Sequence, residues 1–177
     1  MITEKQDILS LHISVNDTTS EILQLVSSFG KKEINIIPFE GSWTAAQVAE
    51  HVTKSNTGIA KEFQKKGKIC EREPDAGVQH LKSVFLNFTT KLRSPEFILP
   101  TRDMYSRETV IRNLKKSIDT LKEVSKNEDL FRVIDHPIFG EVTKLEMLHF
   151  VVYHTQRHIH QLKNIIKILE DQKGKKG

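Results

Sequence analysis

Two histidines near the end of the chain, His154 and His158, are spaced as residues that could share one metal ion. Side chains four residues apart on a helix lie on the same face, one turn above the other. Two imidazoles in that arrangement can chelate a single ion. A histidine on an apolar helix face is more often a hydrogen-bonded core residue than a ligand, so the pair needs a third partner from another segment.

A helix from about Lys144 to Glu170 is expected to carry this pair. The stretch Thr143-Lys144-Leu145-Glu146 has the pattern of a capping box, in which threonine and glutamate side chains bind free N–H groups at the helix start. One face of the helix is apolar except at three positions. In chain order it reads Met147, Phe150, Val151, His154, His158, Gln161, Ile165 and Ile168. The two histidines therefore point toward the expected core.

A third histidine, His51, has an equivalent position on another predicted helix. That helix starts at a second capping box, Thr44 to Gln47, and is closed by Gly67. Its inward row reads Val48, His51, Val52, Ser55, Ile59 and Phe63. Three imidazoles on two helices can form a three-nitrogen metal site with an open coordination position, which is typical of catalytic sites. Neutral imidazole suits Zn, Ni, Fe, Co or Cu.

Gln161 follows His158 by three residues on the same face. We consider it either a group that supports a metal ligand or contacts substrate, or a buried amide bonded to backbone. The remaining histidines are interpreted as structural, and Cys70 as an unreactive thiol. A di-iron site is not expected, because its Glu-x-x-His motif occurs only once, at Glu146 and His149. No proton-transfer residue can be assigned from the sequence.

The composition indicates a soluble globular domain. Of the 177 residues, 37% are hydrophobic and 28% are charged, and no apolar run has the length of a membrane helix. The net charge of +4 lies in small clusters at segment ends, so nucleic-acid binding is not expected. The single cysteine fits a reducing compartment, and the first residues lack the pattern of a signal peptide. These features predict a cytoplasmic protein.

The apolar spacing predicts an all-α fold, a four-helix bundle in one domain over residues 1–172. We expect a first helix from a Thr3 cap to Phe29, with a break available at 16–19, and a third long helix from Ser106 to about 126. Residues 68–102 form a long crossover or insertion with a shorter helix over 78–92. We expect no strands. Residues 173–177 are expected to be a flexible Lys/Gly tail.

The motifs together resemble the DinB-like (YfiT-type) superfamily of metal-binding four-helix bundles. The resemblance rests on Trp43-Thr44 followed by His51, on the G-x-x-T-x-x-E cap, and on H-x-x-x-H-x-x-Q in the last helix. It implies a divalent metal ion, often zinc or nickel, on His51, His154 and His158. It also implies transfer of a low-molecular-weight thiol such as bacillithiol to an electrophile, or thiol-dependent isomerisation.

Three functions stay open at this point. The first is a metal-dependent S-transferase in which a metal-activated thiol attacks an electrophilic small molecule. The second is a metal-dependent hydrolase that uses metal-bound hydroxide, and the third is a non-catalytic metal-binding or stress-related module. We expect the three histidines to cluster at one end of the bundle. Residues 68–102 are expected to set substrate identity, and a homodimer is compatible with such bundles.

Overall fold

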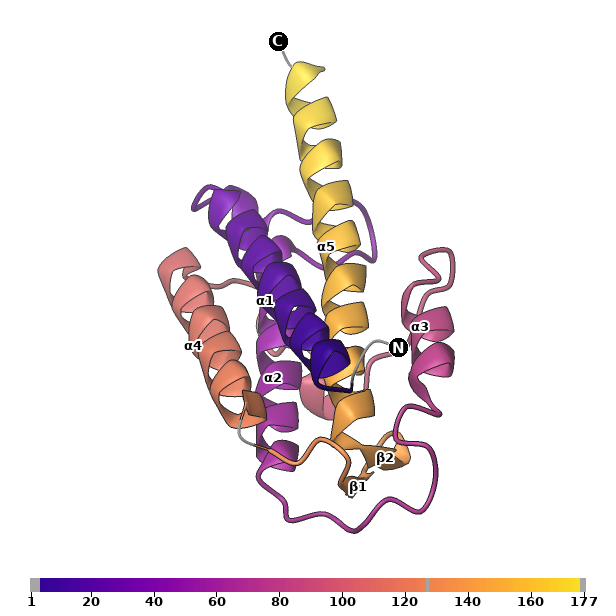
Figure 1. The fold of residues 1–177 in the computed structure, drawn as a ribbon. Coiled ribbons are helices and arrows are strands. Elements are labelled where there is room, and N and C mark those ends of the chain that lie inside the picture. The colour runs from indigo at the N-terminus through magenta and orange to yellow at the C-terminus, as the bar shows by residue number, and fades with distance from the viewer. Residues whose placement is uncertain (1–3, 127, 176–177) are drawn as a thin grey trace.

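Four long helices make up most of the structure, a computed structural model that describes residues 4–126 and 128–175 (Figure 1). The long helices are α1 (Glu4–Ser28), α2 (Ala45–Phe63), α4 (Arg107–Lys126) and α5 (Lys144–Gly174), and a shorter helix, α3 (Val78–Phe85), lies between α2 and α4 in the sequence. Two 3-10 turns, η1 (Glu33–Asn35) and η2 (Glu96–Ile98), and two strands, β1 (Val133–His136) and β2 (Gly140–Thr143), complete it. The expected cap at Thr3 and the tail residues 176–177 lie outside the described residues.

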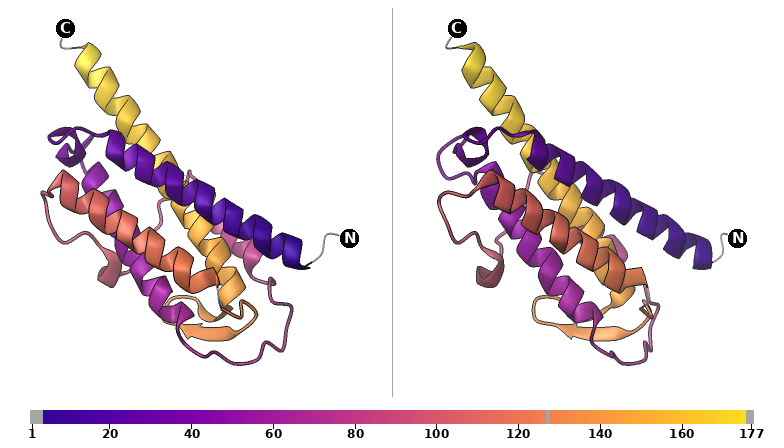
Figure 2. Two further views of the ribbon diagram at one scale, coloured as in Figure 1. Left: turned by 60° about the vertical axis from the view of Figure 1, so that its left-hand side comes forward. Right: turned by 90° about the vertical axis from the view of Figure 1, so that its left-hand side faces the viewer.

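The long helices pack as the expected bundle. The main contacts join α2 to α4 and α1 to α5, and further contacts join α2 to α5 and α1 to α4. The helices therefore surround the core in the order α1, α5, α2, α4. Consecutive helices α1 and α2 lie diagonally across it. Figures 1 and 2 show these helices side by side, with α3 outside the bundle against α5 and the C-terminal end of α5 extending beyond the rest.

Both predicted capping boxes are formed, and they set where α2 and α5 begin. The Thr44 hydroxyl accepts from the Gln47 N–H at 3.2 Å, and the Thr44 N–H donates to the Gln47 side chain at 3.0 Å. Thr143 and Glu146 repeat the pattern at 3.0 and 2.8 Å. Each cap stabilises its helix by about 1 kcal/mol. Fixed starts determine which residues of α2 and α5 face inward.

A buried polar layer divides the core into two apolar clusters. One cluster gathers around Ile22, Val52 and Ile159, and the other around Val15, Ile59 and Val152. Between these positions the buried residues are polar on three helices: Thr18 and Thr19 on α1, Ser55 and Asn56 on α2, and His154, Thr155 and His158 on α5. The inward histidines therefore lie in the middle of the bundle.

Helix α1 is one continuous helix, as predicted, and the break available at 16–19 is not used, because the hydroxyls of Thr18 and Thr19 bond to carbonyls one turn back. Two other predicted boundaries were wrong. Helix α3 ends at Phe85, since the Arg157 guanidinium binds the carbonyls of Phe85 and of residues 87 and 90 just beyond it. Helix α5 continues through Lys173 and Gly174, the expected start of the tail.

The strands were also missed. Strands β1 and β2 pair antiparallel, from Val133 opposite Thr143 to His136 opposite Gly140. Strands of four residues are too short to show alternation in the sequence. Lys68 adds a backbone bridge to Val133, so the chain after α2 meets the hairpin.

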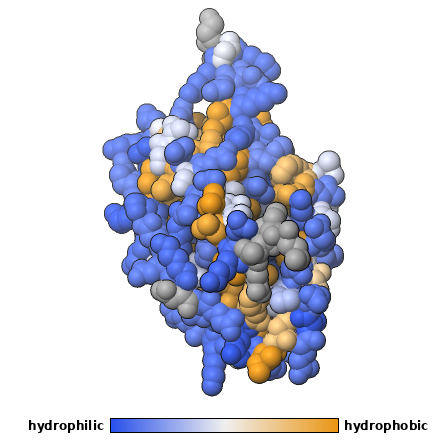
Figure 3. Space-filling view, viewed as in Figure 1, coloured by the Kyte–Doolittle hydropathy of each residue, from blue (hydrophilic) through white to orange (hydrophobic). Residues whose placement is uncertain are grey.

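The face in Figure 3 is mostly hydrophilic, and its apolar residues form small separate patches. Within residues 4–126 and 128–175, no helix combines the length and the apolar character needed to cross a membrane.

The buried carboxylate of Glu146 holds the insertion against α5. It accepts two hydrogen bonds from Arg72, both at 2.7 Å, and one from the Gly77 N–H at 2.6 Å. Burial raises the pKa of Glu146, but these donors and the Thr143 N–H hold it below the ordinary value. The carboxylate therefore stabilises the fold above pH 4.5, and this contribution is lost as the pH falls below that value.

We predict that Glu146→Gln lowers the free energy of unfolding by about 2 kcal/mol at pH 7, because two charge-assisted bonds are weakened. Urea denaturation at pH 7 and pH 4 measures the effect, and the difference from wild type should shrink at pH 4. Glu141→Gln, which changes an exposed partner of Lys68, is the control and should cost less than about 0.5 kcal/mol. Equal losses for both variants would contradict the role of Glu146.

Candidate metal centre

The three predicted histidines converge on one point. The Nε2 atom of His154 lies 3.0 Å from that of His51 and 3.1 Å from that of His158. One ring nitrogen from each residue lies within 4.8 Å of the other two, and all three side chains are buried. His51 is in the second turn of α2, and the others are in the middle third of α5. The cluster therefore lies near the N-terminal end of α2 but in the middle third of α5, whose C-terminal end extends beyond the other helices (Figure 1).

Two of the imidazoles are oriented through their other nitrogen. His51 Nδ1 lies 3.0 Å from the carbonyl oxygen of Ile98. A carbonyl only accepts hydrogen bonds, so this nitrogen carries the hydrogen and His51 Nε2 presents a lone pair. His158 Nδ1 lies 2.9 Å from Gln161 Oε1, which fixes that ring in the same way. Gln161 therefore contacts the ring of His158 through its side chain rather than a backbone group.

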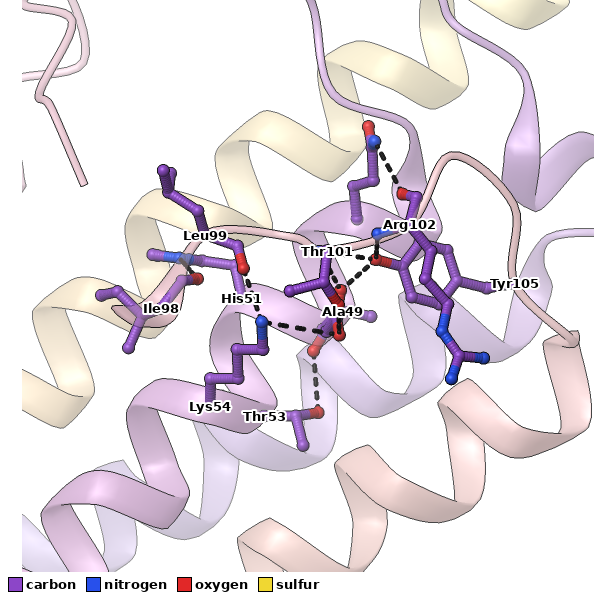
Figure 4. A network of polar contacts seen from close by, with 11 residues as sticks. Ala49, His51, Thr53, Lys54, Ile98, Leu99, Thr101, Arg102 and Tyr105 are labelled. Atoms are coloured by element: carbon purple, nitrogen blue, oxygen red, sulfur yellow. Dashed lines mark hydrogen bonds and ion pairs between the residues drawn. The ribbon is translucent and has the colours of Figure 1, made fainter. Parts of the chain in front are cut away.

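The Ile98 carbonyl belongs to a segment that is bound along α2. We call residues 96–105 the strap. Lys54 donates to the Leu99 carbonyl at 2.5 Å, and Glu50 accepts from the N–H and hydroxyl of Thr101, each at 3.1 Å. Figure 4 shows these contacts beside the one between His51 and Ile98.

Two more contacts complete the attachment of the strap. The Tyr105 hydroxyl donates to Glu50, and the Gln47 amide donates to the Arg102 carbonyl at 3.2 Å. Burial alone would raise the pKa of Glu50. The hydrogen bonds from Tyr105 and Thr101 outweigh this effect and hold the pKa below its ordinary value. Glu50 is therefore a carboxylate at neutral pH and binds the strap as a charged acceptor. The end of the insertion is in this way part of the site.

The arrangement of nitrogens fits a cation. With both Nδ1 atoms donating, the Nε2 atoms of His51 and His158 each direct a lone pair at His154. A single hydrogen on His154 Nε2 can satisfy only one of them. An ion among the three nitrogens would accept every lone pair. Ligand nitrogens on a tetrahedral zinc ion are about 3.3 Å apart, close to the two spacings observed here.

Burial keeps the three imidazoles uncharged. Burial is the main cause, and positive charge on neighbouring histidines and on Arg157 adds to it, so that the pKa of His154 is held well below the ordinary value and that of His158 is lowered to about 3. Burial also lowers the pKa of His51, against the opposing effect of the Ile98 carbonyl. Neutral imidazole is the form that binds metal ions, so at pH 7 a metal ion does not compete with protons here.

Aromatic side chains surround the three imidazoles. The ring of Phe150 stacks on that of His154 with 5.0 Å between the ring centroids. Phe85 meets the same imidazole edge-on at a centroid distance of 6.0 Å, and the ring centroid of Trp43 lies 5.1 Å from that of His51. Such contacts exclude water from the sides of the rings and strengthen electrostatic interactions among them. Neither Phe85 nor Phe150 could be assigned to the site from the sequence, because the spacing of both is that of ordinary core residues.

The other histidines lie outside the cluster. His160 stacks on Phe88, and His149 stacks on Tyr153. His136 is buried in β1, where its Nδ1 accepts from the Ile138 N–H. His80 is exposed on α3, and His12 is partly buried on α1. Cys70 is partly buried in the insertion, where its thiol donates to the Arg72 carbonyl.

A four-helix bundle with inward histidines on facing helices is the architecture in which helical proteins hold metal ions in their interior. The chain belongs to the DinB superfamily, whose sequence profile matches residues 15–162. The matched segment contains all three histidines and Gln161. It confirms the family that the sequence motifs indicated.

Other proteins are similar to this chain in sequence or in fold. The uncharacterized protein YuaE of Bacillus subtilis (strain 168) is 24% identical over 166 residues, which are 88% of this chain and 96% of YuaE. The structure of YfiT from Bacillus subtilis, described as a probable metal-dependent hydrolase with an unusual four-helix bundle topology, superposes with a TM-score of 0.62. It is 15% identical over 96% of this chain and 91% of YfiT.

A further similar structure is TT2238, described as a four-helix bundle protein. It superposes with a TM-score of 0.56 and 20% identity, over 88% of this chain and 97% of TT2238. Both solved structures support the fold.

We predict that Gln161→Leu weakens zinc binding about 10- to 100-fold, because His158 loses the partner that fixes its ring. Competition with a chelating dye measures the dissociation constant. Gln79→Leu, on the exposed face of α3, serves as the control and should bind zinc like wild type. An unchanged constant for Gln161→Leu would show that the amide is only a core group.

We predict that the metal-free protein loses stability as the pH falls below about 6.5. The unfolded chain then binds protons that the buried, low-pKa imidazoles of His154 and His158 do not. One such histidine costs about 2 kcal/mol between pH 7 and pH 5. Urea unfolding of chelator-treated protein at pH 7, 6 and 5 tests this. His158→Gln should flatten the dependence by about one proton, whereas His80→Gln should not.

Proposed function

We propose that the protein is a metal-dependent enzyme in which His51, His154 and His158 hold a divalent ion, zinc or nickel, and in which a low-molecular-weight thiol is transferred to an electrophilic small molecule. The observation that carries the proposal is the convergence of three neutral, buried Nε2 atoms, two of them oriented by Nδ1 partners. Three nitrogen ligands leave a coordination position for a reactant, as catalytic rather than structural sites do.

The chain's own residues bind and orient in this proposal. The Ile98 carbonyl and Gln161 hold two imidazoles with their lone pairs inward. Phe150 and Phe85 limit the access of water to His154. A bound divalent ion would supply the acidity that turns a thiol, with an ordinary pKa near 8.5, into a thiolate at neutral pH.

The transfer itself is a substitution at carbon. The sulfur forms a bond to the electrophilic carbon, the leaving group departs with the electrons of the broken bond, and the thiol proton passes to solvent. No side chain of the protein needs to act as the nucleophile, since Cys70 lies in the insertion and donates to a carbonyl there. The thiol is therefore a second substrate.

Hydrolysis is the second candidate function. It is favoured by the similarity to YfiT, which is described as a probable metal-dependent hydrolase. Water would then take the place of the thiol as the nucleophile, and the same three histidines would serve both reactions. The two functions differ in one measurable respect, which is whether turnover requires an added thiol.

We predict that the metal-loaded protein converts a halogenated arene such as 1-chloro-2,4-dinitrobenzene in the presence of a cellular thiol, and that chelation removes the activity. His154→Ala and His158→Ala should each lose bound metal, measured by elemental analysis, together with turnover. Cys70→Ser is the control and should keep both.

Equal rates in loaded and chelated protein would rule out this mechanism. Turnover of an ester that needs metal but no thiol would establish the hydrolase instead. Purified protein that contains no metal, and whose melting temperature does not rise on adding zinc or nickel, would favour the non-catalytic module.

A further inference from the structure

A cavity of about 360 Å³ lies between α2, the strap and the β hairpin. Its lining includes the apolar side chains of Phe97 and Ile98 from the strap, Ile138 and Phe139 from the hairpin, and Phe150 from α5. The three clustered histidines are not in this lining. Two of its residues touch them, because the Ile98 carbonyl binds His51 and the Phe150 ring stacks on His154. The cavity is therefore next to the candidate metal centre.

Gly58 lies in the lining and is exposed. It is in the interior of α2, where glycine destabilises a helix by about 1 kcal/mol relative to alanine. A Cβ atom built on Gly58 would meet none of the described atoms within 4 Å. The fold would therefore accept a side chain here, on the open side of the cavity. The absence of a side chain leaves the α2 backbone accessible to a ligand at this point.

The walls leave apolar surface for such a ligand to cover. Phe97 of the strap and Ile138 of the hairpin both line the cavity. Their side chains are 62% and 43% exposed. Exposed apolar side chains grouped around a depression are typical of binding sites. The aromatic rings of Phe97, Phe139 and Phe150 suit an aromatic or short acyl body.

The charge of the lining is positive. It contains Lys54 and Lys61 and no carboxylate. Lys54 already binds the Leu99 carbonyl and lies 3.7 Å from Glu50. Lys61 forms no ion pair within the described parts of the chain, and its side chain is exposed. Lys61 is therefore available to an anionic group at the cavity rim.

We infer that this cavity, open at Gly58, binds the electrophilic substrate, an aromatic or short acyl compound with an anionic group that faces Lys61. The role as substrate rests on the proposed function, whereas the binding site itself does not. Ile98 would join the two sites, since its carbonyl orients His51 and its side chain lines the cavity.

The test uses 2-naphthoate as the probe, with the full-length protein in chelator so that binding does not depend on metal. Isothermal titration should show binding to wild type, and Gly58→Leu should weaken it about tenfold or more by filling the cavity. The melting temperature of Gly58→Leu should equal or exceed that of wild type, because leucine favours the helix. Ser20→Leu places the same side chain on the exposed face of α1 and should leave binding unchanged.

The charge is tested with Lys61→Gln and with ligands of matched shape. Lys61→Gln should weaken 2-naphthoate several-fold and leave the neutral 2-naphthamide unaffected. The cationic 2-naphthylmethylamine should bind wild type more weakly than the carboxylate. Unchanged naphthoate binding in Gly58→Leu would overturn the site, and equal affinity for the anion and the cation would overturn the choice of an anionic ligand.

The outcome also separates this inference from the proposed function. If naphthoate binds as expected but no thiol-dependent turnover is found, the cavity stands and the transferase proposal fails. If turnover of an anionic arene is found but Gly58→Leu retains both kcat and KM, the transferase stands and the cavity is not its substrate site.

Discussion

The hydrogen bond between His51 and the Ile98 carbonyl joins the bundle to its long insertion. It determines which nitrogen of His51 faces the other two imidazoles. Glu50 and Lys54, on the same helix as His51, hold the strap by binding Leu99 and Thr101, which follow this carbonyl in the chain. An irregular segment outside the bundle thus helps to orient a site whose ligands all come from the bundle.

The same site weakens the core that contains it. Three imidazoles, Asn56 and Thr155 occupy a layer that apolar residues would otherwise fill, and the Asn56 Nδ2 and Thr155 Oγ1 atoms have no hydrogen-bond partner among the described residues. Buried polar atoms without partners each cost about 1–3 kcal/mol. The two apolar clusters on either side offset that cost. The packing of α2 against α4 and of α1 against α5 holds the layer together.

The sequence predicts those features that depend on neighbours within one helix. The caps at Thr44 and Thr143 and the inward rows of α2 and α5 follow from local spacing, so all three histidines could be identified as a set. Features that depend on distant partners could not be found in this way. The end of α3 is set by Arg157, more than 70 residues away, and the diagonal placement of α1 and α2 has no local signal. The partner of His51 is a main-chain carbonyl, which no residue type marks.

Because a main-chain carbonyl orients His51, a substitution at position 98 has different consequences for the imidazole and for the adjoining cavity. Because any amino acid at position 98 presents the same carbonyl, its side chain can be exchanged without altering the group that orients His51. The side chain at this position nevertheless lines the adjoining cavity, so each exchange reshapes what the cavity can accept. Related chains can therefore diverge in selectivity by substitution in the strap while the three imidazoles keep one arrangement.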